Sequence, residues 1–141
     1  MMWLRKSKKG FTLIELMVVV AIIGVLALLG LRLYTGQQQK AKNAIVKANA
    51  GTIQTLIQAE LADTTSSSVN AMVGDTGENG LFTKSGIHIP DGSTQTENDT
   101  TGVIGTVYVV YDGTLGEESF AINGNGFDEN PVFTIALTAQ K

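Results

Sequence analysis

A single carboxylate, Glu15, lies inside the most apolar stretch of this chain, and its chemistry is the feature that most needs an explanation. Gly10 ends a basic segment five residues before it, and Phe11 begins an apolar run that continues to Leu31. An ionised carboxylate costs about 2.5 to 3.5 kcal/mol near the centre of a membrane helix, and less near its end. The sequence therefore predicts a partner for Glu15, and the alternative is an acid tolerated at the membrane edge.

The other residues that could do chemistry lie in the C-terminal half. Asn125, Asp128 and Glu129 offer the oxygen ligands that Ca²⁺ prefers, as does the segment Asp75–Gly80, but neither set has EF-hand spacing. Gly, Asn and Asp are also ordinary turn residues, so a calcium site and a plain turn both stay open. His88 is the only histidine and the chain has no cysteine, so we interpret His88 as structural. The sequence contains no hydrolase or phosphate-loop motif, and we expect no enzymatic activity and no cofactor.

The apolar run that carries Glu15 is long enough to be a membrane helix. It contains 21 residues from Phe11 to Leu31, and a helix of that length spans about 30 Å, the hydrocarbon thickness of a bilayer. Four of the first nine residues are Lys or Arg, whereas Arg32 is the only cation near the other end. The positive-inside rule therefore predicts a cytoplasmic N-terminus, with everything after Arg32 outside the cytoplasm.

The sequence around Glu15 resembles the N-terminus of the type IV pilin family, which includes the pseudopilins of type II secretion and the competence pilins. The resemblance rests on Lys8-Lys9-Gly10 followed by Phe11-Thr12-Leu13-Ile14-Glu15-Leu16-Met17-Val18-Val19-Val20-Ala21-Ile22-Ile23-Gly24. It implies that a prepilin peptidase recognises Lys8, Lys9 and Gly10, cuts after Gly10 and methylates the new amino group of Phe11. It also implies that the Glu15 carboxylate meets the Phe11 amine of a neighbouring subunit, which would neutralise two charges that an apolar core holds poorly.

By this resemblance the chain is a structural subunit of a type IV pilus, with a role in adhesion, motility or DNA uptake. It is expected in the cytoplasmic (inner) membrane as a single-pass precursor, and then in an extracellular cell-surface filament. Its expected partners are further copies of itself, the prepilin peptidase and the pilus assembly platform. Two alternatives stay open, namely a pseudopilin of a type II secretion system and a monomeric, signal-anchored binding protein. Many pilins have proline at the position of Arg32, so unwinding of the helix between Gly24 and Arg32 is also left open.

Removal of the leader would change the charge of the chain. Four of the ten Lys and Arg residues precede Gly10, so six cations would face thirteen Asp and Glu residues, and the formal charge would fall from −3 to −7. An acidic surface repels nucleic acid, so we expect no direct nucleic-acid binding by this subunit. Asn98-Asp99-Thr100 matches the N-glycosylation pattern, and the alternative is a polar loop.

The chain is expected to have four parts: a leader (1–10), a transmembrane and filament-core helix (11–33), an amphipathic helix (34–62) and a globular β-sheet domain (63–141). The amphipathic part has apolar residues at three- and four-residue spacings, namely Ala41, Ala44, Ile45, Ala48, Ile53, Leu56, Ile57 and Leu61. Ser and Thr residues after it compete for backbone hydrogen bonds, so we expect a loop from 63 to about 80. Strands are predicted at 86–89, 103–112, 119–123 and 132–138. The predicted fold is α+β, a long N-terminal helix packed on a small antiparallel sheet of three to four strands.

Overall fold

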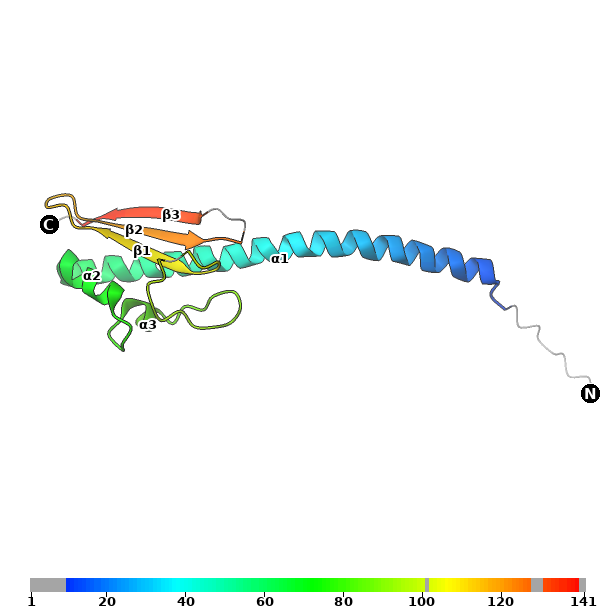
Figure 1. Ribbon diagram of the computed structural model, residues 1–141, viewed down its shortest axis with the longest axis horizontal. Helices are drawn as coiled ribbons and strands as arrows, with labels where there is room; N and C mark the ends of the chain where they lie inside the picture. The colour runs from blue at the N-terminus through cyan, green and yellow to red at the C-terminus, as the bar shows by residue number, and fades with distance from the viewer. Residues whose placement is uncertain (1–9, 101, 128–130, 140–141) are drawn as a thin grey trace, which may run out of the picture. The chain divides into compact units, whose positions relative to one another are not determined.

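The computed structural model describes residues 10–100, 102–127 and 131–139, and it has the predicted α+β architecture. Its elements, in chain order, are α1 (Leu13–Asp63), α2 (Ser66–Gly74), α3 (Leu81–Ser85), β1 (Val107–Asp112), β2 (Ser119–Asn125) and β3 (Pro131–Thr138). The chain forms two units, Met1–Gln37 and Gln38–Lys141, and α1 contributes residues to both. Figure 1 shows the C-terminal part of α1 lying along the three strands.

In the first unit, α1 is an exposed apolar helix. Every residue from Gly10 to Ala41 is exposed, although most of the side chains before Tyr34 are hydrophobic. Within the described residues, α1 is the one helix long and apolar enough to cross a membrane, and its most apolar window has a mean hydropathy of 2.8. The helix continues through Gly24 and Arg32 without interruption, so this segment is α-helical in the single chain.

In the second unit, α1 buries one stripe against the sheet. Val46, Ala50, Ile53 and Ile57 are fully buried at spacings of four, three and four residues. The predicted stripe is wrong in its first half, because Ala41, Ala44, Ile45 and Ala48 are exposed. Seven residues make about two turns of an α-helix, so Val46 shares the face of Ile53, whereas Ile45 is rotated about 80° from it.

The sheet is antiparallel with the strand order β1-β2-β3, so β2 is its central strand. Val109 of β1 pairs with Ile122 of β2, and Ile122 pairs with Ile135 of β3. Alternate residues of β2 are buried, and one of them is Gly124, where a Cβ atom would lie 2.7 Å from Val46 Cγ1. The helix and the central strand therefore approach closely at a position that has no side chain. The rest of the buried core comprises Val69, Val73, Leu81, Phe82, Ile87, Val107 and Phe120.

The loop predicted from 63 to about 80 is a wrong interpretation, because half of it is the helix α2. Thr65 caps this helix through its Oγ1, which accepts a hydrogen bond from the Ser68 N–H at 3.3 Å. Val69 and Val73, four residues apart, are buried on one face. Ser and Thr disfavour a helix interior but are preferred at a helix start. The Ser and Thr residues that follow the end of α1 therefore cap and begin α2.

The number of strands is within the predicted range, but two strand predictions need correction. Segment 86–89 is not a strand, and it contributes only an isolated bridge between His88 and Thr94. β1 begins at Val107 rather than at 103, because Gly105 has a φ of 91°, which is outside the extended region. A Cβ atom on Gly105 would lie 3.0 Å from Pro90 Cδ, so the neighbouring loop also leaves little room for a side chain there.

Candidate functional site: the start of the apolar helix

Glu15 closes a capping box at the start of α1. Thr12 precedes the first helical residue, and its Oγ1 accepts a hydrogen bond from the Glu15 backbone N–H at 3.3 Å. In return, Glu15 Oε2 accepts from the Thr12 N–H at 2.9 Å and from the Thr12 hydroxyl at 2.7 Å. This reciprocal pattern satisfies backbone donors that a helix start leaves unpaired. Glu15 therefore has a partner in its own chain, which the Thr-x-x-Glu spacing could have predicted.

The surface around Glu15 is apolar. Phe11 is 83% exposed, and it lines a shallow depression of about 320 Å³ together with Glu15, Ile14, Val18 and Val19. The structure thus brings Phe11 and Glu15 to one surface. Among the described contacts, the Glu15 carboxylate bonds Thr12 rather than Phe11. Pairing of Glu15 with the Phe11 amine of another subunit stays a prediction.

The predicted processing site is described only in part. Gly10 is exposed, and a Cβ atom built on it would have no heavy atom within 4 Å. Lys8 and Lys9, the predicted recognition residues of the leader, lie outside the described residues. Cleavage after Gly10 and methylation of Phe11 therefore stay predictions. The structure adds that Gly10 itself is exposed.

The candidate calcium ligands of the C-terminal loop are also described only in part. Asn125 ends β2, and its Nδ2 donates to Thr106 Oγ1 at 3.2 Å, which ties this side chain to the residue before β1. Asp128 and Glu129 lie outside the described residues. Within the described ranges, no group of three or more His, Cys, Asp or Glu side chains could hold a metal ion. The calcium site stays a prediction.

The other candidate residues have structural contacts. Asp75 Oδ1 accepts a hydrogen bond from the Gly77 N–H at 2.8 Å, which is a turn contact and not a ligand arrangement. His88 is exposed, and its Nε2 lies 3.2 Å from Thr94 Oγ1 across the isolated bridge. These contacts agree with the interpretation of His88 as structural.

Two side-chain amides cover the outer edge of β1. Gln95 Oε1 accepts from the Val107 N–H at 3.0 Å, and Gln95 Nε2 donates to the Val107 carbonyl. Asn98 pairs with Val109 in the same way, with both hydrogen bonds at 2.8 Å. Each amide imitates the peptide group of an additional strand, so part of this sheet edge is closed. A glycan on Asn98 Nδ2 would break one of these pairs, which favours the polar-loop interpretation of Asn98-Asp99-Thr100.

Two aspartates hold turns in the second unit. Asp91 Oδ1 accepts from the Ser93 hydroxyl at 2.7 Å and from the Ser93 N–H at 2.8 Å. Asp112 Oδ1 accepts from the Thr114 hydroxyl at 2.7 Å and from the Thr114 N–H at 3.1 Å. These hydrogen bonds, above all those from the hydroxyl groups, favour the ionised form and hold the pKa of both carboxyl groups below the usual value.

Residues 5–31 match the family described as the prokaryotic N-terminal methylation motif. The fimbrial protein EcpB of Eikenella corrodens is 47% identical over 56 residues, which cover 40% of this chain and 35% of that protein. A type IV major fimbrial protein FimA of Dichelobacter nodosus is 34% identical over 98 residues, or 70% of this chain and 56% of FimA. Fimbrial protein Q of Moraxella bovis is 37% identical over 81 residues, which cover 57% of this chain and 52% of that protein. The chain thus spans about a third to just over half of the length of these relatives, and no solved structure matches it.

Proposed function

We propose that this chain, which carries the N-terminal methylation motif of prokaryotic prepilins and has type IV fimbrial pilins as relatives, is a structural subunit of a type IV pilus. The observation that carries the proposal is that the motif leads directly into a helix whose apolar side chains are all exposed up to Tyr34. Such a surface needs an apolar environment, and the membrane and the core of a helical filament both provide one.

In this proposal the chain is made as a prepilin. A prepilin peptidase recognises the basic leader ending in Lys8-Lys9-Gly10, cuts after Gly10 and methylates the Phe11 amine. The exposed surface around Gly10 supports access by such an enzyme. The uncut chain is held in the cytoplasmic membrane by α1 as its single transmembrane helix, since α1 is the described helix long and apolar enough to cross a bilayer.

Assembly uses Glu15 and Phe11. In a filament core, an unpaired amine and an unpaired carboxylate would each carry a desolvation cost, and contact between subunits would neutralise both. The shared depression supports this role, because Phe11 and Glu15 are both exposed and line the same surface. The pilus assembly platform would add subunits one at a time, and the second unit would form the acidic outer surface of the filament.

The relatives favour a pilus over a type II pseudopilin, because those compared are fimbrial proteins. The net charge of −7 after cleavage supports a subunit that does not bind nucleic acid by itself. Adhesion and motility are roles of the assembled filament in this proposal, and they need no catalytic site on the subunit.

The first experiment is mass spectrometry of the N-terminal peptide from sheared cell-surface filaments and from membranes. We expect an abundant chain that begins at methylated Phe11 in the filaments. A mature chain found only in membranes would favour a pseudopilin, and an intact leader on functional protein would contradict the proposal.

The second experiment separates processing from assembly. Glu15→Gln keeps the acceptor oxygen of the capping box but removes the charge, so we expect normal cleavage after Gly10 and at least tenfold fewer surface filaments. The matched control is Glu117→Gln, which neutralises an exposed acid between β1 and β2. Filament yields that are equal in the two variants would contradict a role of the Glu15 charge in assembly.

A further inference from the structure

A second candidate site lies where α1 ends and α2 begins. A pocket of about 360 Å³ is lined there by Leu61, Ala62, Thr64, Thr65, Ser66, Glu118 and Ala139. Glu118 directly precedes β2 and Ala139 directly follows β3, and the Ala139 N–H donates to the Glu118 carbonyl at 2.8 Å. The ends of two helices and two neighbouring strands therefore meet around one small space, whose size is within the usual range for small ligands.

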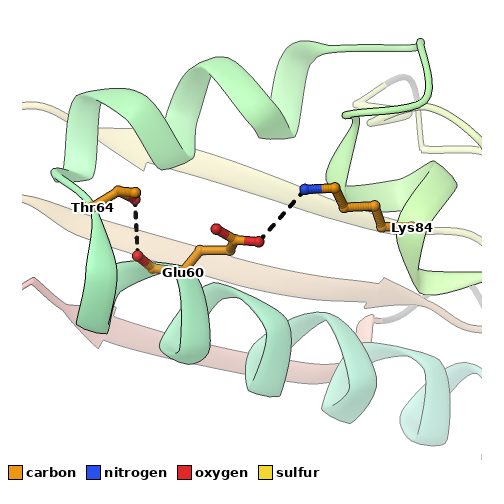
Figure 2. A network of polar contacts seen from close by, with 3 residues as sticks. All are labelled: Glu60, Thr64 and Lys84. Atoms are coloured by element: carbon orange, nitrogen blue, oxygen red, sulfur yellow. Dashed lines mark hydrogen bonds and ion pairs between the residues drawn. The ribbon is translucent and has the colours of Figure 1, made fainter.

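Glu118 gives this pocket its charge. The residue is only 8% exposed, yet its carboxylate makes no hydrogen bond or ion pair with the residues that the structure describes. The described ion pair in this region joins Lys84 Nζ to Glu60 Oε1 at 3.7 Å, as Figure 2 shows, so Lys84 is engaged elsewhere. Within the described residues no side-chain oxygen is both fully buried and unpaired, so the Glu118 carboxylate keeps contact with solvent through the pocket. No described side chain supplies a cation beside it, so a cation that enters the pocket would find an unpaired carboxylate.

The surroundings of Glu118 also favour a positive group. The carbonyls of Leu61 and Ala62, in the last turn of α1, accept no described hydrogen bond from the following backbone, and the helix dipole makes this end negative. The opposing N-terminus of α2 is already capped, because the Ser68 N–H donates to Thr65 Oγ1. The described lining thus combines one acid with hydroxyl groups and with a helix end whose last carbonyls have no described backbone partner, and this combination favours a positively charged ligand.

We propose that this pocket binds a primary ammonium group on an aliphatic chain, such as a lysine side chain or a small alkyl diamine. The ammonium group has three donors for Glu118 and the neighbouring oxygen atoms, and its carbon chain packs against Leu61, Ala62 and Ala139. A calcium ion would require six to eight oxygen ligands, and the described lining of the pocket contains a single carboxylate, that of Glu118. The ammonium group comes either from a free amine or from a lysine of a second copy of this chain.

Calorimetry on the full chain in detergent tests the site with 1,5-diaminopentane as the probe and 1,5-pentanediol as the uncharged control. We expect the diamine to bind and the diol not to bind. Glu118→Gln should weaken diamine binding at least tenfold, whereas Glu117→Gln, its exposed neighbour, should leave it unchanged. Equal thermal unfolding of the two variants shows that both are folded. Diamine binding that persists in Glu118→Gln would overturn the assignment.

Zero-length carbodiimide crosslinking separates the two sources of the ammonium group. Mixed filaments of ¹⁵N-labelled and unlabelled chains should give a Glu118–lysine crosslink between copies if the neighbour supplies the lysine, and the diamine should suppress that crosslink. Diamine binding without such a crosslink identifies a free amine as the ligand. A crosslink confined to one chain, or the absence of both crosslink and diamine binding, would overturn the proposal.

Discussion

The close approach of α1 to the central strand gives the sharpest prediction on stability. Gly124→Ala would place a Cβ atom 2.7 Å from Val46 Cγ1, whereas carbon atoms in contact normally lie about 3.5 to 4.0 Å apart. The helix or the strand would have to move by about 1 Å, and both residues are buried. Overpacking of this kind costs about 1 to 3 kcal/mol, so we expect a loss of that size in the free energy of unfolding.

A second substitution tests whether this contact causes the loss. Val46→Ala removes the clashing Cγ1 atom, and alone it should cost about 1.6 kcal/mol for two buried methyl groups, plus a cavity term. In the double variant, the new Cβ atom on residue 124 occupies part of that cavity. We therefore expect the double variant to be more stable, by about 1 kcal/mol or more, than the sum of the single effects predicts.

Urea unfolding of the full chain in a mild detergent, followed by circular dichroism, measures these differences. Gly51→Ala is the matched control, because Gly51 lies in the same helix and a Cβ atom there has no neighbour within 4 Å. That variant should gain up to about 1 kcal/mol from helix propensity. Additive effects of the two core substitutions, or a neutral Gly124→Ala, would refute the close packing of α1 on β2.

Three further predictions concern polar contacts. Asn98→Ala leaves a backbone N–H and carbonyl of β1 without their partners, so it should cost about 1 to 3 kcal/mol in urea unfolding, and Asn98→Asp should recover only the contact to the N–H. The lowered pKa of Asp91 means that its hydrogen bonds to Ser93 stabilise the fold above the unfolded pKa, near the usual value of 3.8, and that this stabilisation is lost as pH falls through the folded pKa. The difference in unfolding midpoint between wild type and Asp91→Asn should therefore shrink from pH 6 to pH 2, and a constant difference would contradict it. Thr12→Val removes the hydroxyl of the capping box but keeps the shape of the side chain, so amide exchange in the first turn of α1 should accelerate relative to Thr12→Ser, in which the bond to Glu15 persists.

The features that could be predicted from sequence are those that depend on local pattern. The length and hydropathy of the run from Phe11 to Leu31 predict a long apolar helix, and α1 contains all of this run except its first two residues. The sequence also predicts a partner for the Glu15 carboxylate, and in the single chain that partner is Thr12. The expected charge pair requires a second subunit, whereas the capping box needs only the Thr-x-x-Glu spacing.

The features that could not be predicted depend on packing between distant segments. Ile45 and Val46 are equally apolar neighbours, and contact with Gly124 in β2 decides that Val46 is the one turned inward. The edge of β1 is covered by amides from a segment about ten residues earlier, with Gln95 in the position that another strand would take. Composition predicts that this segment is polar, but it does not reveal which backbone groups the amides satisfy.

The capping box gives Glu15 two alternative partners, and this bears on how assembly would proceed. Its carboxylate already accepts two hydrogen bonds from Thr12, so it costs less in an apolar environment than a bare carboxylate would. In the proposed filament, the Glu15 carboxylate would pair with the Phe11 amine of another subunit and would keep or give up its hydrogen bonds from Thr12. The gain in free energy on assembly would be the difference between this pairing and the Thr12 hydrogen bonds of the single chain. A small free-energy difference suits a subunit that must be stable in the membrane and then enter a filament. Glu15 has a partner in both places, namely Thr12 in the membrane and the Phe11 amine of another subunit in the filament.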